Sequence, residues 1–270
     1  MRPMLARRSL LRSAALCPLC APLTAPLGAA LGATLGASAA RASGGAHWGY
    51  EGADGPEHWA ALSPEYRACT AGTEQTPIDL AAGIPAQTGR IGFAYHPQPL
   101  QVVNNGHTIQ VNVAPGSMMA IGETGYELLQ FHFHHPAEHL LAGKAAAMEC
   151  HFVHRSPAGA LAVAGVFLQP GRVNAALVPI WKAMPVAAGP VQAVAGVTVD
   201  PAALLPRDRT YFRYMGSLTT PPCSEGVLWT VFRDPVALAP EQIRAFAALF
   251  PMNARPAQPL GRRFLLESGV

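Results

Sequence analysis

The pattern that most restricts the fold lies at residues 130–134, where the sequence runs Gln-Phe-His-Phe-His. A β-strand points successive side chains to opposite faces of its sheet. His132 and His134 therefore share one face, while Phe131 and Phe133 share the other, where apolar rings pack into a core. This segment predicts a strand that is packed on one side and carries a polar site on the other.

A second strand of this kind is expected at residues 148–154, Met-Glu-Cys-His-Phe-Val-His. The same alternation places Glu149, His151 and Val153 on one face. The connection between the two strands, residues 136–147, is short enough for them to be antiparallel neighbours. Two imidazoles from the first strand and one from the second can then converge on a single point.

Three neutral imidazole nitrogens suit Zn²⁺, and a zinc ion with three protein ligands keeps its fourth position for water. Cys150 faces away from His151, so the two strands offer no obvious fourth ligand for a closed structural site. The pattern favours a catalytic zinc site over ordinary surface or core histidines. Gln130 and Glu149 each precede a histidine by two residues on its own face, where a side-chain acceptor can orient the ligand ring.

Short apolar or alternating runs elsewhere predict a mainly β, or α+β, protein. Strands are expected at 100–103, 108–113, 127–134, 148–154 and 161–168, the last of them apolar on both faces like a central, covered strand. A tight turn is expected at 104–106, Asn-Asn-Gly, and a helix at 240–250. No linker or repeat follows residue 47, which predicts a single domain.

The basic charge of the chain is concentrated at its N-terminus. The sequence has 19 Lys and Arg against 16 Asp and Glu, a formal net charge of +3. Residues 1–42 hold five arginines and no carboxylate, so the rest of the chain has 14 basic and 16 acidic side chains, a net charge of −2. Nucleic-acid binding requires a clustered basic face, and this composition excludes that class of protein.

Residues 1–42 are predicted to be a cleaved export signal. A basic stretch precedes an uncharged run at 13–40, and Ala-Arg-Ala closes the segment at 40–42. The alternative is an uncleaved anchor, because the run is long enough to span a bilayer, but its prolines and glycines keep its hydrophobicity modest. The pair Arg7-Arg8 resembles a twin-arginine signal, although such pairs also occur in Sec signals.

The cysteines agree with export. Cys17 and Cys20 belong to the leader, which leaves Cys69, Cys150 and Cys223 in the body. In an oxidising compartment, an odd number of cysteines predicts one disulfide and one buried thiol. The residues alone do not choose the pair.

Beyond the histidine strands, the sequence resembles an alpha-class carbonic anhydrase of the exported bacterial type from about residue 47 to residue 263. The motifs that carry the resemblance are His-Trp-Gly-Tyr at 47–50, Gln-Thr-Pro-Ile-Asp at 75–79, Asn-Asn-Gly-His at 104–107, the histidine strands at 130–134 and 149–154, Gly-Ser-Leu-Thr-Thr-Pro-Pro-Cys at 216–223, and Asn-Ala-Arg-Pro-Ala-Gln-Pro-Leu at 253–260. The resemblance implies that residues 43–270 form one domain around a large, mostly antiparallel twisted sheet with a few short helices, and that zinc lies in a conical cleft.

The resemblance also assigns the reacting groups. It implies that His132, His134 and His151 bind zinc. Thr219 matches the hydroxyl that accepts a hydrogen bond from zinc-bound hydroxide and donates its own proton to Glu138. Such a pair would aim the hydroxide at the carbon of the substrate.

Further residues match groups around the metal. The apolar wall that holds carbon dioxide is matched by Val153, Val163, Leu218 and Trp229. Thr220 matches a residue that hydrogen-bonds bicarbonate. His107 matches the proton shuttle, a role suited to an imidazole with an ordinary pKa of about 6.5. The groups that order the water chain are matched by Tyr50 and Asn105.

The resemblance pairs Cys69 with Cys223 in the disulfide common in exported bacterial members, which leaves Cys150 as a buried free thiol. Two residues depart from the family pattern. His135 stands where many relatives have Trp, and Cys150 replaces an aliphatic residue. Neither residue has one of the roles given above.

The implied function is the reversible hydration of carbon dioxide to bicarbonate and a proton by a periplasmic or secreted zinc enzyme, with esterase activity as a side reaction. The expected partners are the small-molecule substrate and at most a second copy of the chain, with no nucleic acid and no stable membrane association after cleavage. Two other functions are a non-catalytic binding module on the same fold and a periplasmic protein that buffers metals through its histidine-rich segment.

Overall fold

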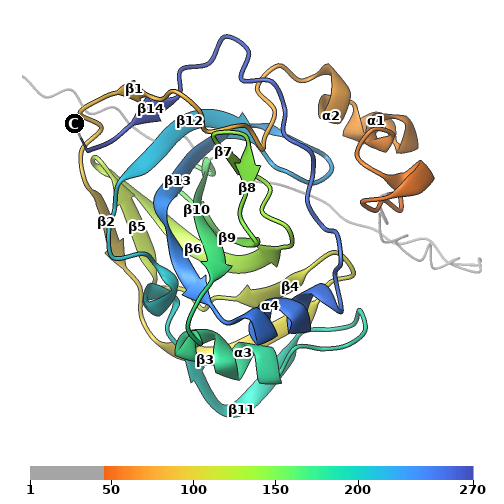
Figure 1. Ribbon diagram of the computed structural model, residues 1–270, viewed down its shortest axis with the longest axis vertical. Coiled ribbons are helices and arrows are strands. Elements are labelled where there is room, and N and C mark those ends of the chain that lie inside the picture. The colour runs from red at the N-terminus through yellow and green to blue at the C-terminus, as the bar shows by residue number, and fades with distance from the viewer. Residues whose placement is uncertain (1–45, 270) are drawn as a thin grey trace, which may run out of the picture. The chain divides into compact units, whose positions relative to one another are not determined.

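One twisted sheet of twelve strands organises the computed structural model, which describes residues 46–269 (Figure 1). The strands of this sheet are β1 Ile84–Pro85, β2 Ile91–Ala94, β3 Gln98–Asn104, β4 Ile109–Asn112, β5 Met118–Ile121, β6 Thr124–His134, β9 Met148–Arg155, β10 Leu161–Pro170, β11 Gln192–Val199, β12 Tyr211–Ser217, β13 Glu225–Leu238 and β14 Leu266–Glu267. Their order is β1-β14-β12-β13-β10-β9-β6-β4-β3-β11, and β5 pairs with both β6 and β2. A separate hairpin joins β7 Leu140–Leu141 to β8 Lys144–Ala145.

The sheet is mostly antiparallel, as predicted. Only the pairs β10–β13 and β1–β14 are parallel among the described strands. The helices are short: α1 Trp59–Leu62, α2 Ala68–Ala71, α3 Val178–Lys182, α4 Pro240–Ala247, and four 3-10 turns at Gly52–Asp54, Pro64–Tyr66, Ala175–Leu177 and Pro201–Leu204. None of the helices within residues 46–269 is long and apolar enough to cross a bilayer. The predicted export signal lies outside the described residues.

The five predicted strands correspond to β3, β4, β6, β9 and β10, with ends that differ by a few residues. The apolar run of β10 is central, because β9 and β13 flank it. The Asn-Asn-Gly turn joins β3 to β4, and Gly106 has a φ of +90° that favours glycine there. The predicted helix at 240–250 is three residues too long, because the chain turns after Ala247 and reaches Pro251, which cannot continue a helix.

The longest strand, β13, was not among the predicted ones. Its pairing with β10 is regular from Leu228 to Phe232 and resumes at Val236, so Pro235 lies in the irregular stretch between them. A proline is tolerated at such a bulge because no ladder hydrogen bond is needed from it. Strand β13 therefore continues past Pro235, although a proline usually ends a strand.

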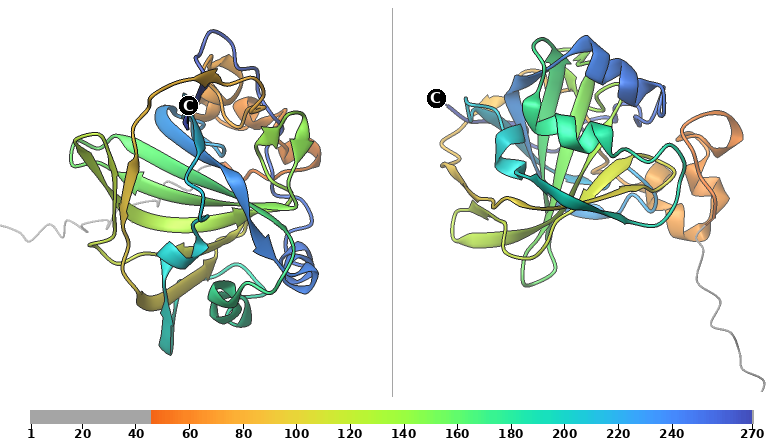
Figure 2. Two further views of the ribbon diagram at one scale, coloured as in Figure 1. Left: turned by 60° about the vertical axis from the view of Figure 1, so that its left-hand side comes forward. Right: turned by 90° about the horizontal axis from the view of Figure 1, so that it is seen from below.

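The sheet separates two apolar clusters. Phe131, Phe133 and Cys150 belong to the first cluster, which lies on the side of the sheet where α3 and α4 pack (Figure 2). The ring of Phe133 lies 4.9 Å from Trp181 of α3 and 6.1 Å from Phe246 of α4. Val163, Trp229 and their neighbours form the cluster on the other face. Packing of the phenylalanine face of β6 in this way directs the histidine face toward the second cluster.

The segment after α4 returns past the ends of the central strands to reach β14 (Figure 1). It lacks regular secondary structure over most of its length, yet Asn253 and Arg255 within it are buried. Their polar groups need partners inside the protein. Those partners are in the site described next.

Candidate metal centre

The three histidines of β6 and β9 converge as predicted. His132 lies directly opposite His151 in the antiparallel register. The ring centroids of His134 and His151 are 4.5 Å apart, and the ring of His132 lies 5.0 Å from that of His134 and 5.4 Å from that of His151. One ligand nitrogen from each ring lies within 4.8 Å of the others. The three rings can therefore hold one metal ion.

Predicted partners orient two of these rings. His132 Nδ1 donates to Gln130 Oε1 at 2.8 Å, because an amide oxygen can only accept. His151 Nε2 lies 3.0 Å from Glu149 Oε1. These contacts leave Nε2 of His132 and Nδ1 of His151 with free lone pairs. An acceptor that binds one nitrogen of an imidazole in this way determines that the other nitrogen is the one available to a metal.

The third ring is oriented by a residue that sequence reasoning missed. His134 Nδ1 donates to the Asn253 carbonyl at 2.8 Å. The opposite nitrogen, Nε2, is buried and has no hydrogen-bond partner. A buried acceptor without a partner is costly, and a metal ion would satisfy it. The donor set and this orphaned nitrogen both fit a metal that prefers imidazole.

Burial keeps all three rings uncharged, which is the form of imidazole that can bind a metal. It lowers the pKa of His132 well below its ordinary value, lowers that of His134 to about 4, and lowers that of His151 as well. The cause is the cost of placing a charged imidazolium away from water. At neutral pH the three rings are uncharged, and only an uncharged imidazole can bind a metal.

Glu149 is the centre of a buried hydrogen-bond network. Its Oε2 accepts from the backbone N–H groups of Glu138 and His139 at 3.0 and 2.9 Å, and its Oε1 lies 2.7 Å from His139 Nδ1. His139 Nε2 and the Tyr214 hydroxyl are 2.7 Å apart. Burial alone would raise the pKa of Glu149, but His139 and His151 hold it well below its usual range. His139, Glu149 and His151 also form a group that could hold a metal ion. Both nitrogens of His139 already have hydrogen-bond partners, however, so this group supports the cluster of His132, His134 and His151 and does not form a second metal site.

Glu138 and Thr219 are both buried, and the Thr219 hydroxyl is near enough to Glu138 to influence its pKa. Glu138 is completely enclosed, and its Oε1 accepts from the Arg255 backbone N–H at 2.9 Å. Burial raises the pKa of Glu138 to about 7, against the lowering effects of His151, of the hydrogen bond from Arg255 N–H and of the Thr219 hydroxyl. Thr219 is 5% exposed. Among the described residues, Glu138 Oε2 is buried without a hydrogen-bond partner, so the bond from the Thr219 hydroxyl stays a prediction.

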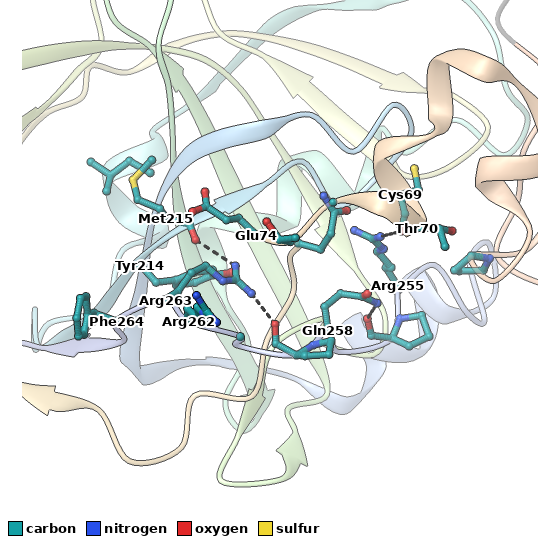
Figure 3. Close-up of a pocket in the computed structure, with 18 of the residues that line it drawn as sticks. Cys69, Thr70, Glu74, Tyr214, Met215, Arg255, Gln258, Arg262, Arg263 and Phe264 are labelled. Atoms are coloured by element: carbon teal, nitrogen blue, oxygen red, sulfur yellow. Dashed lines mark hydrogen bonds between the residues drawn. The ribbon is translucent and has the colours of Figure 1, made fainter.

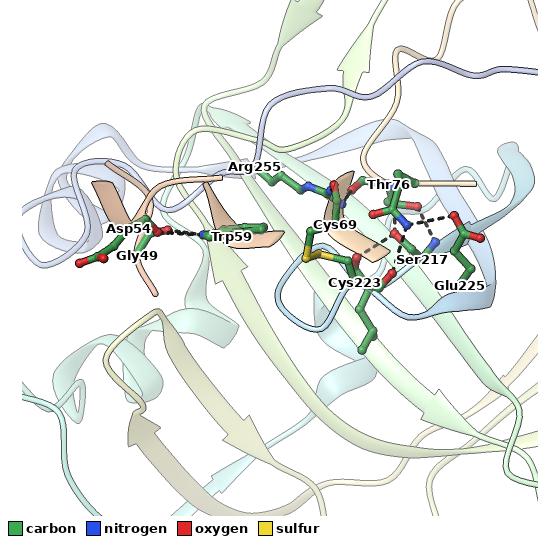
Figure 4. The surroundings of a disulfide bond; sticks show 11 residues. Gly49, Asp54, Trp59, Cys69, Thr76, Ser217, Cys223, Glu225 and Arg255 are labelled. Atoms are coloured by element: carbon green, nitrogen blue, oxygen red, sulfur yellow. Dashed lines mark hydrogen bonds between the residues drawn. A yellow bond between two sulfur atoms is a disulfide. The ribbon is translucent and has the colours of Figure 1, made fainter. Parts of the chain in front are cut away.

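The turn that carries Thr219 is cross-linked. Cys69 and Cys223 form a disulfide, and Cys150 is a buried free cysteine, both as the resemblance implied. Cys223 N–H donates to the Thr220 carbonyl at 2.8 Å, which closes the turn. Figure 4 shows Arg255 beside the disulfide, where its Nη2 donates to the Cys69 carbonyl at 2.7 Å.

The predicted apolar wall is assembled by register across three strands. Val163 of β10 is opposite Val153 of β9 and also opposite Trp229 of β13. Cross-strand partners share one face of a sheet, and this is the face of His151, two residues before Val153. Leu218 packs against the same cluster. Val163 and Trp229 are buried, whereas Val153 and Leu218 are partly exposed.

His107 lies at the tip of the β3–β4 turn. Its ring stacks on Trp48, with centroids 3.6 Å apart and planes 5° from parallel. Burial lowers the pKa of His107, and His47 lowers it further. Asn105 is exposed, and its Oδ1 accepts from the backbone N–H groups of His107 and Thr108 at 3.0 Å. Asn105 therefore stabilises the turn that was predicted at 104–106, and its part in a water chain stays a prediction.

Tyr50 and Thr220 lie near the site without a contact that defines their roles. Tyr50 packs with Trp48 and Trp59, at ring distances of 5.6 and 6.0 Å. Burial raises the pKa of Tyr50, and Glu138 raises it further. Thr220 is half-buried next to Thr219. The roles predicted for both residues stay predictions.

Four residues of the network were not foreseen: His139, Tyr214, Asn253 and Arg255. They reach the site from a loop, from β12 and from the C-terminal segment, so no strand periodicity marks them. One signal was available in Gly165 of β10, because a glycine in an apolar strand often marks a close approach. A Cβ at Gly165 would lie 2.9 Å from Glu149 Oε1.

Comparison with known proteins agrees with this geometry. A family model described as eukaryotic-type carbonic anhydrase matches residues 54–268. A carbonic anhydrase of Nostoc sp. is 46% identical over 227 residues, which cover 82% of this chain and 86% of that protein. The structure of an alpha-carbonic anhydrase from Thermovibrio ammonificans, in complex with the inhibitor sulfanilamide, matches with a TM-score of 0.79 at 44% identity, covering 83% of this chain and 100% of the other. Dioscorin complexed with ascorbate matches with a TM-score of 0.76 at 32% identity, covering 82% and 97%. The chain belongs to the eukaryotic-type, or alpha-class, carbonic anhydrases, the enzymes that hydrate carbon dioxide.

Proposed function

We propose that the chain hydrates carbon dioxide as a zinc enzyme, with His132, His134 and His151 as the metal ligands. The observation that carries this proposal is the convergence of three neutral imidazoles, in which Nε2 of His134 is buried and has no partner among the described residues. A donor set of nitrogens alone favours zinc over magnesium or calcium, which prefer oxygen. Bound zinc with an open position would supply a nucleophile at neutral pH by acidifying water, a property known for carbonic anhydrases as a class.

Thr219 and Glu138 orient the attacking group in this proposal. Because the Glu138 carboxylate accepts the Thr219 proton, the Thr219 oxygen is left with only its acceptor capacity toward the nucleophile. Burial of Glu138 disfavours its charged form, and a dication held by the nearby histidines would favour it again. The pair fixes the direction in which the nucleophile points, and such positioning of a reacting group increases the rate.

The wall of Val153, Val163, Leu218 and Trp229 receives the substrate. Carbon dioxide is small, neutral and apolar, so an apolar surface beside the ligand histidines holds it without strong polar contacts. The partly exposed Val153 and Leu218 form the accessible part of this wall. In this proposal Thr220, next to Thr219, hydrogen-bonds the bicarbonate product.

His107 transfers the released proton to solvent in this proposal. Its half-buried ring lies at a turn between the interior and the surface, and an imidazole accepts and releases protons near neutral pH. Tyr50 and Asn105 would help to order the intervening water. Stacking on Trp48 holds the ring in one defined position.

The ligand assignment is tested by His132→Asn, with His135→Asn as the matched control. The adjacent His135 donates from its Nδ1 to the Pro251 carbonyl at 3.0 Å and does not belong to the ligand cluster. We expect His132→Asn to lose both zinc and carbon dioxide hydration, and His135→Asn to keep both. Zinc content by elemental analysis and stopped-flow hydration are the measurements, and full activity of His132→Asn would refute the assignment.

The same measurements separate the other two functions. A metal-buffering protein would bind several metal ions per chain, whereas the proposed enzyme binds one. A non-catalytic binding module would keep its fold and show no hydration. Esterase activity toward 4-nitrophenyl acetate is proposed as a side reaction, and it should disappear with zinc in His132→Asn.

We also propose that the protein is exported, with residues 1–42 as a cleaved signal. The disulfide supports this proposal, because disulfides are typical of oxidising compartments outside the cytoplasm. N-terminal sequencing of the protein from the periplasmic and secreted fractions tests it. A chain that retains residues 1–42 in the membrane fraction would show the anchored alternative instead.

A further inference from the structure

A groove of about 1310 Å³ lies between residues 69–75, β12 and residues 255–264 (Figure 3). None of the three ligand histidines lines it, and neither does Thr219. Its apolar lining includes Met215, Leu228, Phe264 and Leu266. Met215 is 42% exposed and Phe264 is 72% exposed, which is unusual for side chains of this size. We call this cavity the arginine groove, for the reason given next.

Four arginines line the arginine groove: Arg213, Arg255, Arg262 and Arg263. Two carboxylates, Glu57 and Glu74, line it as well, so the lining has a formal excess of two positive charges. Among the described residues, the arginines that have a carboxylate within 4.0 Å are Arg233 and Arg244. The four groove arginines have none, so their positive charge is not neutralised by an ion pair.

Several guanidinium groups in the lining also have unused donors. Arg213 Nε and Nη2 are buried without hydrogen-bond partners, and so is Nε of Arg255, a residue that is only 2% exposed. Thr230, opposite Arg213 in the β12–β13 register, is fully buried, and its hydroxyl also lacks a partner. Buried donors left unpaired destabilise a protein. These atoms are enclosed, so a ligand in the groove would meet the exposed guanidinium of Arg262 directly and would reach them only through a local rearrangement.

Arg263 and Arg213 are nevertheless held in place. Arg263 donates to the carbonyls of Leu260, Met215 and Pro259 at 2.8–3.0 Å. Arg213 donates to the Thr88 carbonyl at 3.3 Å and stacks over the Tyr211 ring at 4.6 Å. Two cations are therefore ordered before any ligand arrives, which lowers the entropy cost of binding.

We propose that the arginine groove binds an amphipathic organic anion, a free molecule with one negatively charged head and an apolar body. The arginines would recognise the head, and Met215 and Phe264 would cover the body. The volume exceeds that of most drug-sized sites, so it can hold such a molecule whole. The groove shares Arg255 and Tyr214 with the network behind the metal centre but none of the ligand histidines, and the proposal does not depend on the function proposed above.

The probe for this proposal is 8-anilinonaphthalene-1-sulfonate, an aromatic sulfonate whose fluorescence rises on binding. The test variant is Arg262→Glu with Phe264→Ala, because both side chains are exposed and neither supports the fold. The matched control is Arg172→Glu with Val173→Ala, an exposed arginine beside a valine that is 61% exposed and outside the groove. We expect the test variant to weaken binding by at least ~10-fold and the control to leave it unchanged.

Three results would overturn the proposal. Equal binding by the test variant and the control would show that the probe binds elsewhere. Loss of binding in His132→Asn, or displacement of the probe by saturating sulfanilamide, would place it in the metal centre. Co-sedimentation with vesicles containing an anionic lipid, lost in the test variant, would identify a membrane surface as the source of the anion. Carbon dioxide hydration should stay normal in the test variant, which separates this outcome from failure of the proposed function.

Discussion

Removal of the disulfide should lower both the stability and the activity of the protein. The bond joins α2 to the turn that carries Thr219, and its two cysteines are 154 residues apart in the sequence. The perturbation is the double variant Cys69→Ala with Cys223→Ala. Both cysteines are buried, so alanine places no polar group in the interior.

The size of the stability loss follows from the loop that the bond closes. A cross-link restricts the unfolded chain, and the entropy that it removes grows with the logarithm of the loop length. For a separation of 154 residues, this relation predicts a loss of about 5 kcal/mol in the free energy of unfolding at 25 °C. For a domain of this size the melting temperature should fall by roughly 10–20 °C.

Activity should fall for a local reason. Cys223 has a φ of 56°, a left-handed conformation that costs a non-glycine residue about 1 kcal/mol. Without the cross-link the turn can relax and move Thr219 away from Glu138. Because small misplacements of positioned groups reduce rates strongly, we expect kcat to fall by about 10-fold or more.

The assays are urea unfolding at 25 °C without reductant and stopped-flow hydration of carbon dioxide. The control is a reductant: it should bring the unmodified protein toward the double variant and have no effect on the double variant itself. A loss below about 1 kcal/mol would refute the loop-entropy argument, because it would mean that the unfolded chain is already restricted. Unchanged kcat would refute the link between the cross-link and Thr219.

Four further predictions concern single residues. Glu149→Gln should weaken zinc retention by about 10–100-fold, measured by competition with a chelator, because the partner of His151 loses its charge. Val153→Tyr should lower kcat/KM for carbon dioxide with zinc content unchanged, because the larger side chain fills the space beside the ligands; normal kinetics would place the substrate elsewhere. Burial lowers the pKa of His154 from 6.5 to about 4, so the unfolded chain takes up a proton that the folded chain excludes as the pH falls through this range. Stability should therefore be intact above pH 6.5 and fall by about 3 kcal/mol toward pH 4, and His154→Gln should flatten this part of the urea-unfolding profile. His107→Ala should reduce turnover mainly in dilute buffer, with recovery on addition of imidazole; equal rates at all buffer concentrations would place the proton shuttle elsewhere.

The histidine cluster was accessible from sequence because a strand has a simple period. Alternation on β6 and β9 places His132, His134 and His151 on one face, and a short connection makes the two strands neighbours. The same period identified Gln130 and Glu149 as their partners and placed Val153 on the ligand face. Local geometry of this kind needs no knowledge of the rest of the fold.

The partners that complete the site come from parts of the chain where no period exists. Asn253 orients His134 from a segment without regular secondary structure, 119 residues further along the chain. His139 reaches Glu149 from a loop, and Tyr214 reaches His139 from a strand that was not predicted. Each is buried and hydrogen-bonded only because the fold brings distant segments together, a relation that residue types do not encode locally.

The sequence by itself predicted the histidine cluster, the mainly β class and, through the resemblance, the disulfide and the proposed reacting pair. Tertiary structure alone decided which nitrogen of His134 is free, because the Asn253 carbonyl occupies the opposite one. It also decided that four arginines without ion pairs share one groove. The physical reason is the same in both cases: strand alternation acts between neighbours in sequence, whereas burial and hydrogen-bond pairing act between neighbours in space.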